Sequence, residues 1–183
     1  MKTALTVLIA AVVCVPAFSG DLKLESKTFT ASEAFEAMKS LDGTWTGEAN
    51  VVKEGQPKEE GTKSETSVTY NVIANDTSIV ATYGEGTPTE MVSLFHQDGP
   101  DKLIHTHYCA AGNQPSMQFK PCSDPNTITF LFSGGTNMDV TKDGHAHDTT
   151  IRIVNENTIE SISALWSGGK QYSTRYATMT RQK

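Results

Sequence analysis

Four of the five histidines in this 183-residue sequence form two His-x-His pairs, His105 with His107 and His145 with His147. Both pairs lie in segments whose composition favours β-strand, where side chains two residues apart point to the same face. Each pair therefore presents two imidazoles on one side of its strand. If the two strands share a sheet or a barrel wall, the imidazoles could converge on a transition metal or a polar ligand. The spacing indicates a site but names no reaction, so whether the protein is an enzyme stays open.

The elements that must position these histidines are short strands separated by turn signals such as Asn-Asp, Asp-Gly-Pro-Asp and Gly-Gly. The predicted strands span 44–53, 63–74, 78–84, 89–97, 102–109, 116–120, 127–133, 146–154, 158–166 and 170–180. Tight turns between strands give an antiparallel meander, and a long meander avoids exposed edges most simply by closing on itself. We therefore expect an all-β domain over residues 30–183, a closed or nearly closed barrel of about ten strands.

Three different segments precede the predicted barrel. Residues 1–19 combine Lys2, an apolar run too short to span a membrane and small residues at its end, a pattern typical of a signal peptide. We expect export to a secreted or periplasmic location, removal of this segment, and no membrane span after cleavage. Residues 20–29 are predicted to be a flexible lead-in. Thr30 and Glu33 then match a capping box, which predicts a short helix over 31–40 that covers one end of the fold.

Charge and cysteine content exclude one class of partner and leave one question open. The formal net charge is −6, and no cluster of Lys and Arg exists, so we expect no nucleic-acid partner. Loss of Cys14 with the signal peptide leaves Cys109 and Cys122, which an oxidising compartment would allow to pair. The alternatives are one disulfide or two separate buried thiols. The oligomeric state is open as well.

The start of the first strand resembles a known signature. Gly43-Thr44-Trp45 is similar to the Gly-x-Trp motif of lipocalin-like ligand-binding barrels. In that family the Trp fills the closed end of the barrel, and an Arg from the last strand covers it. The resemblance implies a structural role for Trp45, with Arg175 as the covering residue and Arg181 as the alternative.

A second resemblance extends over residues 91–180. It consists of Thr106-His107-Tyr108-Cys109, Gly112-Asn113-Gln114-Pro115, Asn137, Gly144-His145-Ala146-His147 and Trp166. In this order the residues resemble an uncharacterised group of bacterial exported lipocalin-like (calycin-type) β-barrel proteins. The resemblance implies a barrel and the position of a site, but no reaction. His105 lies outside the shared pattern.

Strand alternation predicts how the histidines are oriented. His145 and His147 share a face with Ile151 and Ile153, the more apolar and hence inward face. In an antiparallel meander, the end of strand 102–109 lies at the same rim as the start of strand 146–154. We therefore expect both imidazoles, together with His107, to point into the barrel at one rim. His105 is expected to lie deeper on its strand.

The leading functional hypothesis is an exported protein that binds a small apolar or amphipathic molecule in the barrel. Such sites combine apolar walls with a few polar groups that orient the ligand. The polar groups expected at the mouth are His107, Tyr108, Asn113, Gln114, Asn137, His145 and His147.

Two alternatives remain. His107, His145 and His147, with or without Cys109, could bind a transition metal such as zinc, and an open coordination position would permit a metal-dependent enzyme. A resemblance to nitrobindin-type barrels adds haem, with His147 or His145 as the axial ligand. In the other alternative the histidines only satisfy buried polar groups, and the barrel is a scaffold without a ligand.

Overall fold

The structure, a computed structural model, describes residues 28–183. The expected signal peptide and residues 20–27 of the lead-in lie outside the described residues. The described elements are α1 (Ala31–Lys39), β1 (Gly43–Lys53), the 3-10 helix η1 (Lys58–Glu60), β2 (Thr62–Ile73), β3 (Ser78–Tyr83), β4 (Met91–Gln97), β5 (Leu103–Tyr108), β6 (Gln114–Lys120), β7 (Thr127–Thr136), β8 (His145–Asn155), β9 (Thr158–Ser167) and β10 (Lys170–Arg181).

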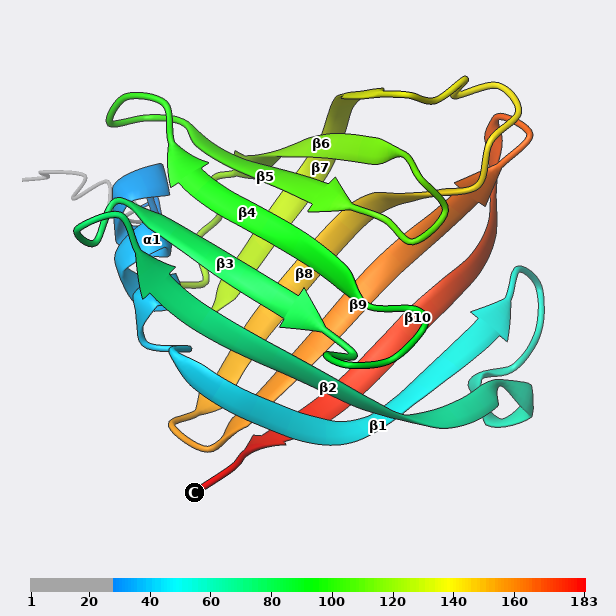
Figure 1. Ribbon diagram of the computed structural model, residues 1–183, viewed down its shortest axis with the longest axis horizontal. Helices are drawn as coiled ribbons and strands as arrows, with labels where there is room; N and C mark the ends of the chain where they lie inside the picture. The colour runs from blue at the N-terminus through cyan, green and yellow to red at the C-terminus, as the bar shows by residue number, and fades with distance from the viewer. Residues whose placement is uncertain (1–27) are drawn as a thin grey trace, which may run out of the picture.

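The strands form one closed barrel in which every strand pairs antiparallel with its neighbours (Figure 1). Closure comes from β1 and β10, which pair from Trp45 opposite Arg181 to Lys53 opposite Ser173. The predicted all-β meander barrel is therefore confirmed, because ten strands in chain order leave no unpaired edge once first and last meet. No helix within residues 28–183 is long and apolar enough to span a membrane.

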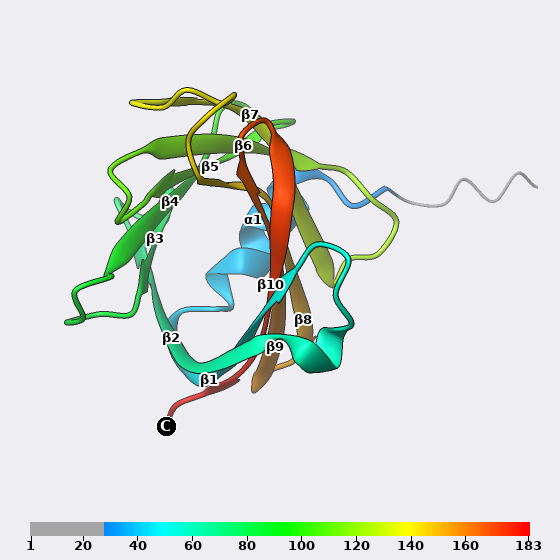
Figure 2. The same ribbon diagram turned by 90° about the vertical axis from the view of Figure 1, so that its right-hand side faces the viewer.

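The helix α1 covers one end of the barrel, as Figure 2 shows. Its predicted capping box is present, with Thr30 and Glu33 each bonding the other's backbone N–H. The apolar side of the helix buries Phe35 and Met38 completely. Ahead of α1, Phe29, which the sequence places in the flexible lead-in, is buried and forms a β-bridge with Cys122.

Trp45 closes the same end of the barrel from inside. Its indole is 0% exposed, and Nε1 donates a 2.7 Å hydrogen bond to the carbonyl of Leu41 in the segment that joins α1 to β1. Around it lies an apolar core to which nearly every strand contributes, including Tyr70, Ile79, Phe95, Leu103, Met117, Phe130, Ile151, Ile159 and Met179. We call this end of the barrel the closed end.

Arg181, and not Arg175, covers Trp45. The Arg181 guanidinium lies 4.2 Å from the centroid of the Trp45 ring, which is cation–π geometry. It also donates hydrogen bonds to the carbonyls of Ser40 (2.7 Å) and Asp42. The assignment of Arg175 from the resemblance is therefore corrected. Register explains the difference, since β10 places Arg181 directly opposite Trp45 and places Arg175 opposite Val51, three residue pairs further along the same face.

We expect Arg181→Gln to lower the free energy of unfolding by about 1–3 kcal/mol, because it removes the cation–π contact and the hydrogen bonds to three carbonyls, those of Ser40, Asp42 and Glu156. Chemical denaturation with urea measures this change. Arg152→Gln is the matched control, since Arg152 forms only an exposed ion pair with Glu160 (3.3 Å), which contributes about 0–1 kcal/mol. Equal denaturation midpoints for the two variants would contradict the structural role of Arg181.

Candidate functional site

The end of the barrel opposite α1 remains open to solvent. Here β3 ends, β4 begins and the loops β1–β2, β5–β6, β7–β8 and β9–β10 gather (Figure 1). Several inward-facing side chains near this end are partly exposed: Val51, Thr66, Met91, Leu165 and Arg175. At this end, therefore, solvent reaches side chains that face the barrel interior.

Between the apolar core and the open end lies a polar group built around Ser93. His105 Nε2 is 2.9 Å from Ser93 Oγ, and His107 Nδ1 is 3.0 Å from the same oxygen. The three side chains come together because Ser93 is paired with His107 across β4 and β5, and His105 precedes it on the same face. Phe95 stacks on the His105 ring at 4.4 Å. We call this group the Ser93 cluster.

Both imidazoles of the Ser93 cluster are neutral at ordinary pH. Burial lowers the pKa of His105 to about 3, with a further contribution from His107, and burial lowers the pKa of His107 to about 4. Desolvation has this effect because the charged form loses its hydration while the neutral form loses little. The cluster therefore offers neutral hydrogen-bonding groups inside the barrel.

These depressed pKa values predict that acid destabilises the protein through His105 and His107. The unfolded imidazoles bind protons below pH ~6.5, whereas the folded ones do not until pH 4 or below. The stability is therefore complete above pH ~6.5 and falls below it, by up to about 1.4 kcal/mol per pH unit for each histidine. Urea midpoints between pH 7.5 and 5 should depend less steeply on pH in His105→Gln and His107→Gln. Native-state NMR in which either ring titrates near pH 6 would refute this.

Arg175 lies on the inward face near the Ser93 cluster. Its Nη2 donates a 2.7 Å hydrogen bond to Thr66 Oγ1. Tyr70 and Tyr83 are close enough to interact electrostatically with its guanidinium, and burial raises the pKa of both phenols. Burial also lowers the pKa of Arg175, although a guanidinium remains charged in proteins. The interior beside the open end therefore carries one positive charge among neutral hydroxyls and imidazoles.

A β-bulge changes the predicted orientation of the second histidine pair. The register between β8 and β9 shifts between Ala146 and Asp148, which leaves His147 as the extra residue. Beyond a bulge the two faces exchange, so Ala146 packs against the core and His145 shares a side with its partner Trp166. The prediction that His145 and His147 both point inward with Ile151 is thus wrong.

His147 instead forms the middle of a three-ring stack. Its imidazole lies 4.5 Å from the Phe132 ring and 4.0 Å from the Trp166 ring, nearly parallel to both. The stack occupies the place where β7 and β8 stop pairing, beyond Phe130 opposite Thr149. Asp148 supports it, because its Oδ1 accepts a 2.8 Å hydrogen bond from the Phe132 backbone N–H. In this gap, the three stacked rings and the Asp148 carboxylate connect β7 and β8 in place of backbone hydrogen bonds between the strands.

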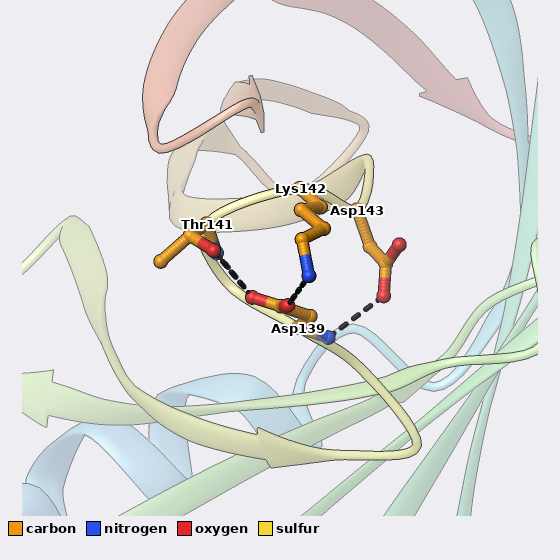
Figure 3. A network of polar contacts seen from close by, with 4 residues as sticks. All are labelled: Asp139, Thr141, Lys142 and Asp143. Carbon is orange, nitrogen blue, oxygen red and sulfur yellow. Dashed lines mark hydrogen bonds and ion pairs between the residues drawn. The ribbon is translucent and has the colours of Figure 1, made fainter.

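Acidic residues organise the β7–β8 loop that precedes His145, and Figure 3 shows their contacts with one another. Asp139 accepts hydrogen bonds from Thr141 N (2.9 Å) and Oγ1 (2.6 Å) and pairs with Lys142 at 2.8 Å. Asp143 accepts a 2.7 Å bond from the Asp139 backbone, and its own carbonyl is 2.9 Å from His145 Nδ1. These carboxylates brace the loop backbone, and the braced loop fixes the imidazole of His145.

The remaining predicted ligand residues mostly bond to loop backbone. Asn113 Nδ2 donates to the carbonyl of Gly144 (2.8 Å), whereas Gln114 and Asn137 both donate to the carbonyl of Gly112 (3.0 and 2.6 Å). Tyr108 is 48% exposed. Tyr108 and Gln114 line a hollow of about 500 Å³ on the outer face of β5–β7, together with Thr106, Ser116, Ser133, Gly134, Gly135 and Thr136.

The structure separates the two histidine pairs. The ring contacts join His105 to His107 (6.4 Å) and His145 to His147 (5.6 Å), and within residues 28–183 no hydrogen bond or ring contact links the two pairs. In this part of the chain no three His, Cys, Asp or Glu side chains form a group that could hold a metal ion. The ligand set of His107, His145, His147 and Cys109 is therefore not assembled.

The expected axial haem ligands, His147 and His145, are also enclosed by other side chains. His147 is stacked between two rings, and its Nδ1 lies 3.1 Å from Asp148 Oδ1. His145 offers a buried Nε2 without a partner among the described residues, but Phe132 and His147 pack against its ring. The two cysteines are separate free thiols, as one of the two alternatives expected, but both are partly exposed and not buried. Cys109 Sγ lies 3.9 Å from Met91 Sδ, and Cys122 donates to the carbonyls of Asp124 and Thr127.

Four polar side chains inside the barrel were not predicted from the sequence: Ser93, Thr66, Tyr70 and Tyr83. One signal was available for Ser93, since it alternates with Met91 and Phe95 on the inward face of its strand. A polar residue at such a position requires a buried partner, and the histidines opposite supply it.

Fold and site together define a ten-stranded antiparallel barrel that is closed at one end and polar inside the other. No protein-family model matches the sequence, and no match is found among curated proteins. Among solved structures the fold is similar to that of Rv2717c from M. tuberculosis, with a TM-score of 0.56 and 16% identity over 82% of this chain and 98% of that one.

A second similar structure is a protein of unknown function from the DUF3598 family of Nostoc punctiforme PCC 73102. The TM-score is 0.55 and the identity 12%, over 79% of this chain and 49% of that chain. This chain thus spans about half the length of the Nostoc protein. At such identities the likeness concerns the fold alone.

Proposed function

We propose that this protein binds a small, largely apolar molecule through the open end of its barrel. The observation that carries the proposal is the contrast between the two ends. Trp45 and α1 seal one end completely, whereas Val51, Met91 and Leu165 remain partly exposed on the inward face near the other. Apolar side chains that face a barrel interior and still meet solvent are suited to contact a ligand.

The Ser93 cluster supplies the polar groups that would orient such a ligand. His107 replaces the larger set of rim residues expected from the sequence, since His145 and His147 are engaged in the ring stack and the β7–β8 loop. A few fixed polar groups beside an apolar wall are the usual division of labour in small-molecule sites.

Ser163→Phe should abolish ligand binding while leaving the fold intact. Ser163 faces inward opposite Arg175 and is partly exposed, so a phenyl ring there fills space that the ligand would need. Ile162→Phe is the matched control, since Ile162 is 45% exposed on the outward face of the same strand. Native mass spectrometry of protein purified from its own host measures the bound molecule. A clean apoprotein mass for the wild type, with no thermal shift from lipids, retinoids or haem, would refute the proposal.

We also propose export, with membership of the bacterial exported lipocalin-like group described above. Lys2 and the apolar run that follows support the first point, and the Thr-His-Tyr-Cys and His-x-His segments support the second. Intact mass measurement of the protein from its host should show a chain that lacks about the first 19 residues. A mature chain that retains Lys2 would contradict export by this route.

A further inference from the structure

Arg175 is a cation inside the barrel, and no carboxylate within residues 28–183 pairs with it. It is half-buried and lies on the inward face, opposite Val51 on one side and Ser163 on the other. Among the described residues its one hydrogen bond goes to Thr66, and no Asp or Glu pairs with it. By contrast, the exposed cations Lys63 and Arg152 each have a carboxylate within 3.3 Å.

Such a charge is costly unless something compensates it. Partial burial removes hydration from the guanidinium, and only one of its five N–H donors is used by a protein acceptor. A structural role at the closed end does not account for Arg175, because Arg181 occupies that position. The unused donors are therefore available to a group that the protein itself does not contain.

One of the neutral groups near Arg175 offers a further donor. Burial raises the pKa of Tyr70 and Tyr83, so both phenols keep their protons, but Tyr83 is already hydrogen-bonded to Tyr70 and to Ser93. In the Ser93 cluster, His105 Nδ1 is buried without a partner. A buried N–H without a partner is rarer than an unpaired acceptor, which favours the tautomer with the proton on His105 Nε2. Ser93 then accepts from His105 and donates to His107 Nδ1, and the proton of His107 lies on Nε2.

We propose that the molecule bound at the open end carries a carboxylate, and that Arg175 binds this carboxylate inside the barrel. His107 Nε2 supplies a neighbouring donor, and Val51, Met91 and Leu165 contact the apolar body. This inference rests on the proposed function and names the ligand class. A guanidinium suits the task because its planar donors match the two oxygens of a carboxylate.

Octanoate and octanamide test the inference by calorimetric titration, since they share a chain and differ in charge. Wild-type protein should bind octanoate at least about tenfold more tightly than octanamide. Arg175→Gln should remove this preference and leave octanamide binding unchanged. Arg152→Gln, which removes the same charge from the outer surface, should behave like the wild type. Equal binding of both probes, unaltered by Arg175→Gln, would overturn the carboxylate and leave the proposed function standing.

A second measurement needs no ligand. Arg175→Met should raise the urea midpoint of the ligand-free protein, because an unbalanced, half-buried charge is replaced by an apolar chain of similar length. Arg181→Met should lower it, since that cation covers the Trp45 ring and donates to three backbone carbonyls. A lower midpoint for Arg175→Met, together with no binding of either probe to the wild type, would assign Arg175 a structural role and overturn both proposals.

Discussion

The closure of one barrel end by Trp45 and Arg181 determines how the rest of the interior can be used. The indole bonds to the Leu41 carbonyl, and the guanidinium covers its ring while it bonds to the carbonyls of Ser40 and Asp42. These contacts join the two ends of the barrel sequence to the segment after α1. Because β1 and β10 meet here, the same contacts also hold the pair of strands that closes the sheet.

Once that end is closed, solvent enters the interior from the other side only as far as the apolar core permits. The polar side chains lie between the open end and the apolar core, and those of the Ser93 cluster hydrogen-bond to one another. One hydroxyl, Ser93, serves two imidazoles, and burial keeps both imidazoles neutral. Arg175 differs from them, since its charge persists at any ordinary pH and the described interior contains no carboxylate beside it. The main chemical feature of this interior is a contrast. The neutral groups hydrogen-bond to one another, whereas the cation Arg175 has no carboxylate partner among the described residues.

The second histidine pair shows how much one extra residue changes. His147 is inserted in β8 without a partner in β9, and the alternation of faces is reversed from that point toward the start of the strand. The two His-x-His pairs are therefore not equivalent. One lies inside the barrel around Ser93, whereas the other belongs to a ring stack that closes the gap between β7 and β8.

The sequence by itself determined the elements and their order. The capping box at Thr30, the Gly-x-Trp at residues 43–45 and the turn residues between apolar segments are local signals, and each predicted strand lies within a few residues of an observed one. The inward position of His105 and His107 also follows from simple alternation, since β5 contains no bulge.

Only the tertiary structure decided which side chains meet. Whether Arg175 or Arg181 reaches Trp45 depends on the register of β1 against β10, and the side to which His145 points depends on a bulge defined by its pairing with β9. Ser93 lies more than ten residues from either histidine in the chain and contacts both through β4–β5 pairing. Register and bulges result from the packing of all strands at once, and the local sequence of one strand does not contain that information.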